Sequence, residues 1–277
     1  MEPILVATDL SARSDRAVTR AARLARAMGR PLHLFAAVGD DLDAAEALER
    51  SEDVLALLEH VGANGEGMRG LDVTASAEVG RAVTLVPEAA QARNAALVVL
   101  GSHRNRGLGE VVGTPTLVRI VRALEQPALV AVGRPNAEYG SVVVGWDFSH
   151  ASEAALRMAG AVAPEAELTV LNATHEPYSG LGTVGAVGHT LSPARREEMA
   201  AEIAAAIPED LRGRTAAPEV RMGAPVQALL DARADLVAVG RHQRSGLVRM
   251  LLGETSSELI LISPSDVLVT PPPTRTS

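Results

Sequence analysis

The sequence predicts an α/β fold made of two tandem, doubly wound (Rossmann-like) parallel-sheet domains with helices on both faces. Its 277 residues correspond to about two domains at roughly 150 residues each. The segment Val6–Ser11 recurs as Val144–Ser149, and Leu97–His103 recurs as Leu236–His242. In each half, short β-branched runs alternate with longer segments of helical spacing, as strands and crossover helices do in a parallel sheet.

The spacing of the repeat is nearly constant along the chain. The offset from Asp9 to Asp147 nearly equals the offset from Gly113 to Gly253 much further on. Landmarks in the same order at one offset indicate a tandem duplication. We place the seam in the segment 135–140, which predicts domain 1 at residues 1–137 and domain 2 at residues 138–277.

The first half begins with a strand and an amphipathic helix. Apolar residues recur at three- and four-residue steps from Ala17 to Met28. Gly29 follows where a C-cap is expected, and Ser11 or Ser14 can cap the start. The fourth apolar run is apolar on both faces, as in a central parallel strand. The expected strands are Ile4–Ala7, Leu32–Ala37, Val73–Ala77, Leu97–Gly101 and Ala128–Val132.

The second half follows the same plan. Its expected strands are Val142–Gly145, Leu168–Asn172, Pro218–Arg221, Leu236–Gly240 and Val267–Thr270, and its expected helices lie at Ser149–Val162, Arg195–Ala206 and Val226–Ala232. The glycine-rich segment His175–Thr190 is expected to form a long loop, either a cover for a ligand or a surface insertion. The last strand of each half is an apolar sheet edge. An unpaired edge of this kind is commonly covered by another copy.

The composition excludes several classes of protein. Hydrophobic residues make up 47% and charged residues 22%, as in ordinary globular proteins. A formal charge of −8 and only 2% aromatic residues argue against a nucleic-acid site. With no cysteine, disulfides, thiolate nucleophiles and Cys-ligated metals are excluded. There is neither a signal peptide nor an apolar stretch of about 18 residues, so we expect a cytoplasmic protein that does not bind membranes.

Four residues are expected to meet at the carboxyl ends of the strands. Asp9 and Asp147 follow the first strand of each half, and Gly101 and Gly240 end the most apolar strands. The carboxyl edge of a parallel sheet forms the ligand crevice, where glycine lets a ligand approach the backbone. Gly113-Thr114-Pro115 is a candidate helix start whose amides could bind phosphate. The alternative is structural: the aspartates cap the first helices, the glycines turn the chain, and Thr114 is only a cap.

These residues resemble the universal stress protein family in its tandem two-domain form. The resemblance covers nearly the whole chain, from the opening strand-Asp-x-Ser-helix through the turns at Glu78-Val79-Gly80 and Met222–Pro225 to the strand ending in Gly-x-His. It implies a stress-response function and a site for ATP or another adenine nucleotide, with Mg²⁺ as a possible partner. It also implies that the last strands of the halves pair between the halves or between chains, giving an intramolecular pseudo-dimer and a homodimer. The nucleotide-binding residues it implies are Ala7, Thr8, Asp9, Gly101, Ser102, His103, Arg104, Gly113, Thr114, Asp147, Gly240 and Gly253.

Both halves depart from the motif of the family members that bind ATP, which is Gly, two residues, Gly, nine residues, then Gly and Ser or Thr. The second glycine position holds Arg104 in one half and Gln243 in the other. Gly113 arrives after eight residues instead of nine, and Gly253 is followed by Glu254. A glutamate beside a phosphate adds like-charge repulsion, so the domain 2 site is the weaker candidate.

Several side chains in these loops have two interpretations. Trp146 could stack on a base or fill the pocket in its place, and His103 and His242 could lie at the crevice or bond their own loops. Four arginines either face the phosphates or lie solvated on the surface, namely Arg104, Arg106, Arg241 and Arg244. His175, Glu176 and His189 lack metal-ligand spacing, so no metal site is expected.

Three hypotheses of function follow. The first is a universal stress protein that binds an adenine nucleotide in domain 1 with little or no turnover. The second is a degenerate member that serves as an interaction module, with both clefts closed by Arg104, Gln243, Glu254 and Trp146. The third is a slow nucleotide hydrolase or transferase that uses His103 or Asp9. Phosphate-loop, dinucleotide and hydrolase-elbow motifs are absent.

Overall fold

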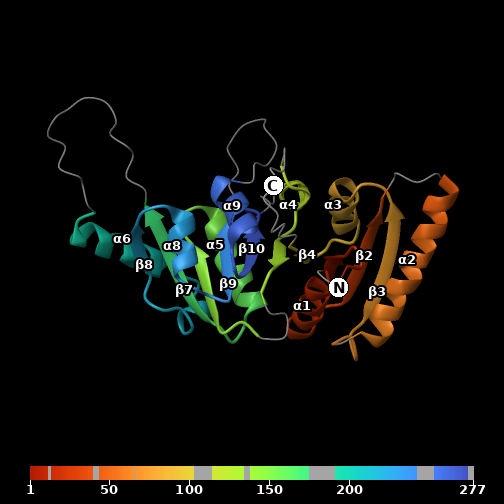
Figure 1. Ribbon diagram of the computed structural model, residues 1–277. Coiled ribbons are helices and arrows are strands. Elements are labelled where there is room, and N and C mark those ends of the chain that lie inside the picture. The colour runs from red at the N-terminus through yellow and green to blue at the C-terminus, as the bar shows by residue number, and fades with distance from the viewer. Residues whose placement is uncertain are drawn as a thin grey trace, which may run out of the picture.

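A computed structural model shows a long twisted sheet with helices on both faces (Figure 1). It describes residues 1–11, 14–39, 44–65, 67–102, 114–133, 138–174, 191–241 and 253–273. In these residues ten strands form one sheet in the order β3-β2-β1-β4-β5-β10-β9-β6-β7-β8. The predicted α/β class with a mainly parallel sheet is confirmed.

The elements of domain 1 follow the predicted alternation of strands and helices. They are β1 (Ile4–Ala7), α1 (Asp15–Ala27), β2 (Leu32–Val38), α2 (Ala44–Asn64), β3 (Val73–Val79), α3 (Ala82–Ala92), β4 (Leu97–Gly101), α4 (Thr116–Ala123) and β5 (Ala128–Ala131). Helix α1 ends as expected, because Gly29 just beyond it has φ +61°, a conformation that glycine adopts without a steric cost.

Domain 2 repeats the plan with one extra short helix. Its elements are β6 (Ser141–Gly145), α5 (His150–Val162), β7 (Glu167–Thr174), α6 (Pro193–Ala206), α7 (Glu209–Arg212), β8 (Glu219–Met222), α8 (Pro225–Asp231), β9 (Leu236–Gly240), α9 (Glu254–Ile262) and β10 (Asp266–Thr270). In each half the first strand lies between the second and fourth strands, and the strands within a half run parallel. The sequence expectation of a doubly wound order is therefore met twice.

The two halves join through their last strands. β5 and β10 pair antiparallel, with Leu129 opposite Leu268, which makes the two five-stranded sheets continuous. Of the two expected modes of pairing, the structure shows the one between halves. The described edges of the sheet are β3 and β8 instead (Figure 1).

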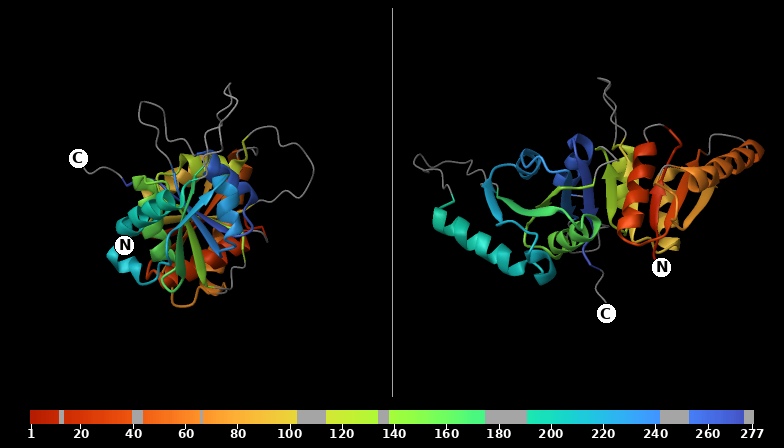
Figure 2. Two further views of the ribbon diagram at one scale, coloured as in Figure 1. Left: turned by 90° about the vertical axis from the view of Figure 1, so that its left-hand side faces the viewer. Right: turned by 90° about the horizontal axis from the view of Figure 1, so that it is seen from below.

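Apolar side chains on both faces of the sheet build two cores. One core lies under α1, α2, α5 and α6 and includes Leu58 and Leu156. The other lies under α3, α4, α8 and α9 and includes Val86 and Leu259. Figure 2 shows α5 and α6 on the side of the sheet opposite α9. No helix in the described part of the chain is long and apolar enough to cross a bilayer.

A buried carboxylate ties the halves together. Asp266, at the start of β10, lies 2.9 Å from Arg20 Nε of α1 and accepts a hydrogen bond from the Tyr139 hydroxyl at 2.6 Å. It also accepts from the backbone N–H groups of Val132 at 2.7 Å and Gly133 at 2.6 Å. The Arg20 guanidinium lies over the Tyr139 ring, 4.3 Å from its centroid. Burial and the nearby Asp266 charge raise the pKa of Tyr139 well above its ordinary value.

Candidate functional site

A cavity of about 140 Å³ lies at the carboxyl ends of β1 and β4 in domain 1; we call it the domain 1 crevice. These strands are neighbours, with Ala7 opposite Leu100. The chain leaves them toward opposite faces of the sheet, which makes this the switch point where ligands bind in open α/β sheets. Five predicted site residues line the crevice together, namely Ala7, Thr8, Asp9, Gly101 and Ser102.

The loop after β1 holds the polar side of the crevice in a fixed turn. The Thr8 hydroxyl donates to Ser14 Oγ at 2.8 Å and accepts from the Leu10 N–H at 3.0 Å. Leu10 has φ +58°, and Asp9 Oδ1 accepts from the Ser11 N–H at 3.0 Å. The Asp9 carboxylate is thus exposed at the end of the strand, held by a turn two residues long.

Asp9 and Asp147 were expected, in one interpretation, to cap the first helix of each half, and the structure corrects this. Asp9 Oδ1 accepts from the Ser11 N–H in the turn before α1, and the N-cap residues of α1 and α5 are Ser14 and Ser149. Ser14 is the N-cap residue of α1, but its side chain makes no capping hydrogen bond. The reason is that the Ser14 hydroxyl donates to the Ser11 carbonyl at 2.8 Å and accepts from Thr8.

The opposite wall of the crevice is apolar. It consists of side chains from β2, α3, β4 and α4, namely Ala37, Ala82, Val86, Leu100, Leu117 and Ile120. Hydroxyls of Ser14, Ser102 and Thr116 lie around it. An apolar wall facing hydroxyls and a carboxylate suits a flat ring joined to a polyhydroxylated group.

Part of the predicted site lies outside the described residues. His103, Arg104, Arg106 and Gly113 fall there, as do His242, Gln243, Arg244 and the segment 175–190. Thr114 is described and exposed, but α4 begins only at Thr116, with Pro115 as its N-cap residue. The sequence offered Thr114 as the cap of this helix, and the observed N-cap residue lies one position further on. Pro115 has ψ 144°, which is extended and not helical.

Domain 2 repeats the backbone of this site with different side chains. Asp147 Oδ1 accepts from the Ser149 N–H at 3.1 Å and from its hydroxyl at 2.6 Å, which repeats the turn at Asp9. Phe148 has φ +63°, as Leu10 has +58°. A Cβ added at Gly145, which matches Ala7, would lie only 3.3 Å from Leu229 Cδ1. Val239 and Leu229 therefore pack closely against the end of the first strand of domain 2.

Trp146 is buried at the position that the repeat matches to Thr8 of the domain 1 crevice. Its ring is buried in the core under α5, on the face opposite the apolar wall of the domain 1 crevice, and meets Phe148 edge-on at 6.5 Å. The Asn172 side-chain amide donates to the Trp146 carbonyl at 2.7 Å. Side chains alternate between faces along a strand, and Trp146 follows Val142 and Val144 into the α5 core. The two sequence interpretations of Trp146 stay predictions.

The two glycines singled out in domain 2 have structural roles. A Cβ at Gly240 would lie 2.5 Å from the backbone carbon of Ala151, so only glycine lets the start of α5 pack against β9. Gly253 is the N-cap residue of α9, and the exposed Glu254 occupies the first turn of that helix.

Arg241 stabilises the contact between the halves. Its side chain is 1% exposed, and Nη1 donates to the carbonyls of Val121 at 3.0 Å and Arg122 at 3.4 Å, at the end of α4. Burial lowers its pKa, an effect that Glu125 opposes. The expectation that Arg241 faces a phosphate or lies solvated is corrected, because β10 brings β9 next to α4 of domain 1. Sequence spacing within one half carries no signal for this contact.

No group of three or more His, Asp or Glu side chains suited to a metal ion occurs among the described residues. The fold and the crevice define the class: a tandem pair of doubly wound α/β domains with a ligand crevice at the switch point of domain 1. Comparison with known proteins specifies the family. The sequence model of the Universal stress protein family matches residues 1–131 and again residues 138–271, so the chain belongs to that family.

Individual relatives align with this chain over nearly its full length. A universal stress protein of Mycolicibacterium smegmatis is 29% identical, with 97% of each chain covered. The crystal structure of a universal stress protein from Archaeoglobus fulgidus aligns with a TM-score of 0.72 at 20% identity, covering 98% of each chain. A functionally unknown protein from Pseudomonas aeruginosa aligns with a TM-score of 0.63 at 19% identity, covering 98% of this chain and 93% of the other. The structural matches support the tandem fold.

Proposed function

We propose that this protein takes part in the stress response by binding an adenine nucleotide, such as ATP with Mg²⁺, in the domain 1 crevice, with little or no turnover. The observation that carries the proposal is that β1 and β4 bring Asp9 and Gly101 to the same cavity. The family resemblance assigns these positions to the nucleotide. Domain 2 is not proposed as a second site, because Val239 and Leu229 pack closely against Gly145 there.

The residues present fit the base and ribose of such a ligand. The apolar wall at Val86 and Ile120 suits the flat face of a purine, and Asp9 can accept a hydrogen bond from a ribose hydroxyl. Binding sites for whole small molecules usually occupy about 300–1,000 Å³, so a cavity of about 140 Å³ suits a ring-sized part of the ligand. The phosphates would extend beyond Gly101 and Ser102.

The chain offers a matched pair of variants for the test. Asp9→Ala and Asp147→Ala remove the same carboxylate from the same kind of turn, one in each half. We expect calorimetric titration of nucleotide-stripped protein with Mg·ATP to show one site per chain. Asp9→Ala should weaken it about 10- to 100-fold, which corresponds to the loss of one charged hydrogen bond, whereas Asp147→Ala should leave it unchanged.

Two other outcomes point elsewhere. No heat of binding, with no small molecule released for mass spectrometry, would favour the interaction module. Steady release of phosphate from ATP that Asp9→Ala abolishes would favour the slow hydrolase. A homodimer stays a prediction, and it would need surfaces other than β5 and β10 because these strands pair with each other.

A further inference from the structure

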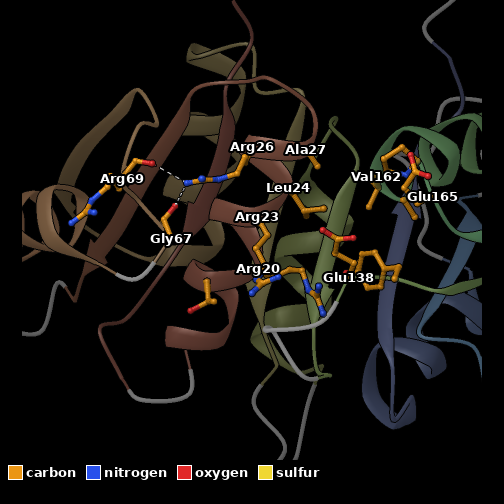
Figure 3. A pocket seen from close by; sticks show the side chains of 14 residues that line it. Arg20, Arg23, Leu24, Arg26, Ala27, Gly67, Arg69, Glu138, Val162 and Glu165 are labelled. Carbon is orange, nitrogen blue, oxygen red and sulfur yellow. Dashed lines mark hydrogen bonds between the residues drawn. The ribbon is translucent and has the colours of Figure 1, made fainter.

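A second hollow lies where the two halves meet, on the face of the sheet opposite the apolar wall of the domain 1 crevice (Figure 3). We call it the junction groove. It has a volume of about 620 Å³ and runs between α1 of domain 1 and the end of α5 in domain 2. That volume is within the range of sites for small molecules.

The base of the junction groove is apolar and comes from both halves. Leu24 and Ala27 of α1 face Val162, Ala163 and Pro164 at the end of α5. Leu24, Val162 and Ala163 are buried, whereas Ala27 and Pro164 are exposed to the groove. A ligand with an apolar body would therefore cover hydrophobic surface contributed by both domains.

Positively charged side chains line one side of the groove and negatively charged side chains line the other. Arginines on the domain 1 side are Arg20, Arg23, Arg26 and Arg69, whereas Glu138 and Glu165 lie on the domain 2 side (Figure 3). Among the described residues, Arg20 is the arginine of this groove that forms an ion pair, with Asp266. Arg23 and Arg26 supply the positive charge on the domain 1 side, because the Arg69 side chain points away from the hollow (Figure 3).

Two of these arginines retain the ability to bind an anion. Arg26 Nη2 donates to two backbone carbonyls, Gly67 at 2.8 Å and Arg69 at 2.9 Å, which orient the guanidinium without neutralising its charge. Arg23 is half-buried one turn back along α1, and among the described residues no hydrogen bond or ion pair of its side chain is found. A guanidinium beside apolar surface is suited to a carboxylate, sulfonate or phosphate.

We propose that the junction groove binds a small organic acid with an apolar body. The anionic group lies against Arg23 and Arg26, and the apolar body lies across Ala27 and Pro164 at the junction of the halves. Glu138 and Glu165 repel a second negative end, so a ligand charged at one end is favoured over a polyanion. The ligand contacts both domains, so its binding stabilises the junction.

Two dyes with nearly the same apolar body separate the charge from the apolar contact. The anionic probe is 1-anilinonaphthalene-8-sulfonate, and the neutral probe is N-phenyl-1-naphthylamine. We expect fluorescence titration to give one saturable site per chain for the anionic dye. The neutral dye should bind about tenfold more weakly, and saturating Mg·ATP should displace neither.

Matched variants on two helices locate the site. Arg23→Gln and Ala27→Glu in the groove should each weaken the anionic dye about tenfold or more, and Arg23→Gln should not change binding of the neutral dye. Arg196→Gln and Ala201→Glu make the same changes on the exposed face of α6 and should leave both dyes unaffected. Circular dichroism and the melting temperature of each variant establish that it is folded.

Three results would overturn the proposal: equal binding of the two dyes, an equal loss in the α6 variants, or displacement of the anionic dye by ATP. The last would place the dye in the domain 1 crevice. Because Asp9→Ala tests that crevice alone, failure of this proposal is distinguishable from failure of the proposed nucleotide site.

Discussion

The two halves share a backbone and differ in the chemistry of their side chains. Unusual left-handed residues recur at matching places: Leu10 with Phe148, at φ +58° and +63°, and Asn94 with Arg233, at +48° and +51°. The side chains that follow the central strands differ, with Ser102 at the crevice and Arg241 buried in the contact between the halves. The duplicated chain thus kept the turns that position a site, while one copy adopted residues that serve the interface.

The contact between the halves is also asymmetric. Arg20 and Asp266 form a buried pair on one side of the junction. In the other half, the repeat places Met158 at the position equivalent to Arg20 and Pro127 at the position equivalent to Asp266. These two residues cannot form an ion pair, so the near-symmetric sheet is fixed by a polar contact that occurs only once.

The largest effect is expected from breaking that single pair. Asp266→Ala leaves the buried Arg20 guanidinium without its carboxylate and removes the acceptor of Tyr139. Loss of one partner of a buried pair typically costs about 3–5 kcal/mol of the free energy of unfolding, to be measured by urea denaturation. The control Glu153→Ala breaks the exposed pair with Arg157 and should cost at most about 0.5 kcal/mol. Equal losses in the two variants would contradict a special role for Asp266.

Acid should destabilise domain 1 through a histidine that domain 2 lacks. His33 of β2 is buried and bonded to Thr74 Oγ1 at 2.8 Å and Ser76 Oγ at 2.9 Å. Burial, and then the nearby Arg93, lower its pKa from 6.5 to about 4. The unfolded chain therefore binds the proton more readily, so stability present above pH 6.5 is lost as the pH falls toward 4.

The full loss from His33 should be at most about 3–4 kcal/mol, because a tenfold change in proton affinity corresponds to about 1.36 kcal/mol. The repeat places Thr169 of β7 at the equivalent position in domain 2, which makes His33→Thr the natural variant. Urea midpoints of the two proteins should converge as the pH falls from 7 to 4. A constant difference between the two curves would show that protonation of His33 is not linked to folding.

The next prediction concerns the residue that follows the central strand of each half, Ser102 in domain 1 and Arg241 in domain 2. Arg241→Ser copies Ser102 of domain 1 and leaves the carbonyls of Val121 and Arg122 without their donor. We expect a loss of about 1–3 kcal/mol in the free energy of unfolding, with unchanged affinity for Mg·ATP. A loss of affinity with unchanged stability would instead assign Arg241 to a phosphate.

The smallest effect concerns the starts of the first helices. Ser149 caps α5 by accepting from the Ser152 N–H at 3.2 Å, whereas Ser11 accepts from the Ser14 N–H only at 3.4 Å. Ser149→Ala should cost about 1 kcal/mol, the usual value for an N-cap, and Ser11→Ala should cost less. Thermal unfolding of the two variants compares the caps, and a larger loss in Ser11→Ala would reverse the ranking.

Much of the fold could be read from local patterns. β-branched runs marked strands such as β4 and β9 with their observed bounds, and the repeat of Asp9 at Asp147 pointed to the duplication. The meeting of Asp9 with Gly101 also followed, because parallel strands carry their carboxyl ends to one edge of the sheet. The start of α4 was misplaced because Thr114-Pro115 has the composition of a cap, while the backbone of Pro115 remains extended.

By itself, the sequence determined the alternation of strands and helices, the duplication and the placement of one crevice. These features follow from local signals, namely the period of the hydrophobic residues and the residue types at the ends of strands. Only the tertiary structure decided that β5 pairs with β10, that Arg241 bonds α4, that Trp146 lies in the core, and that a groove opens between α1 and α5. Those features join residues from different halves or depend on which face of the sheet a side chain takes. The contacts between the halves form only when the two sheets pack together, and no pattern of neighbouring residues encodes them.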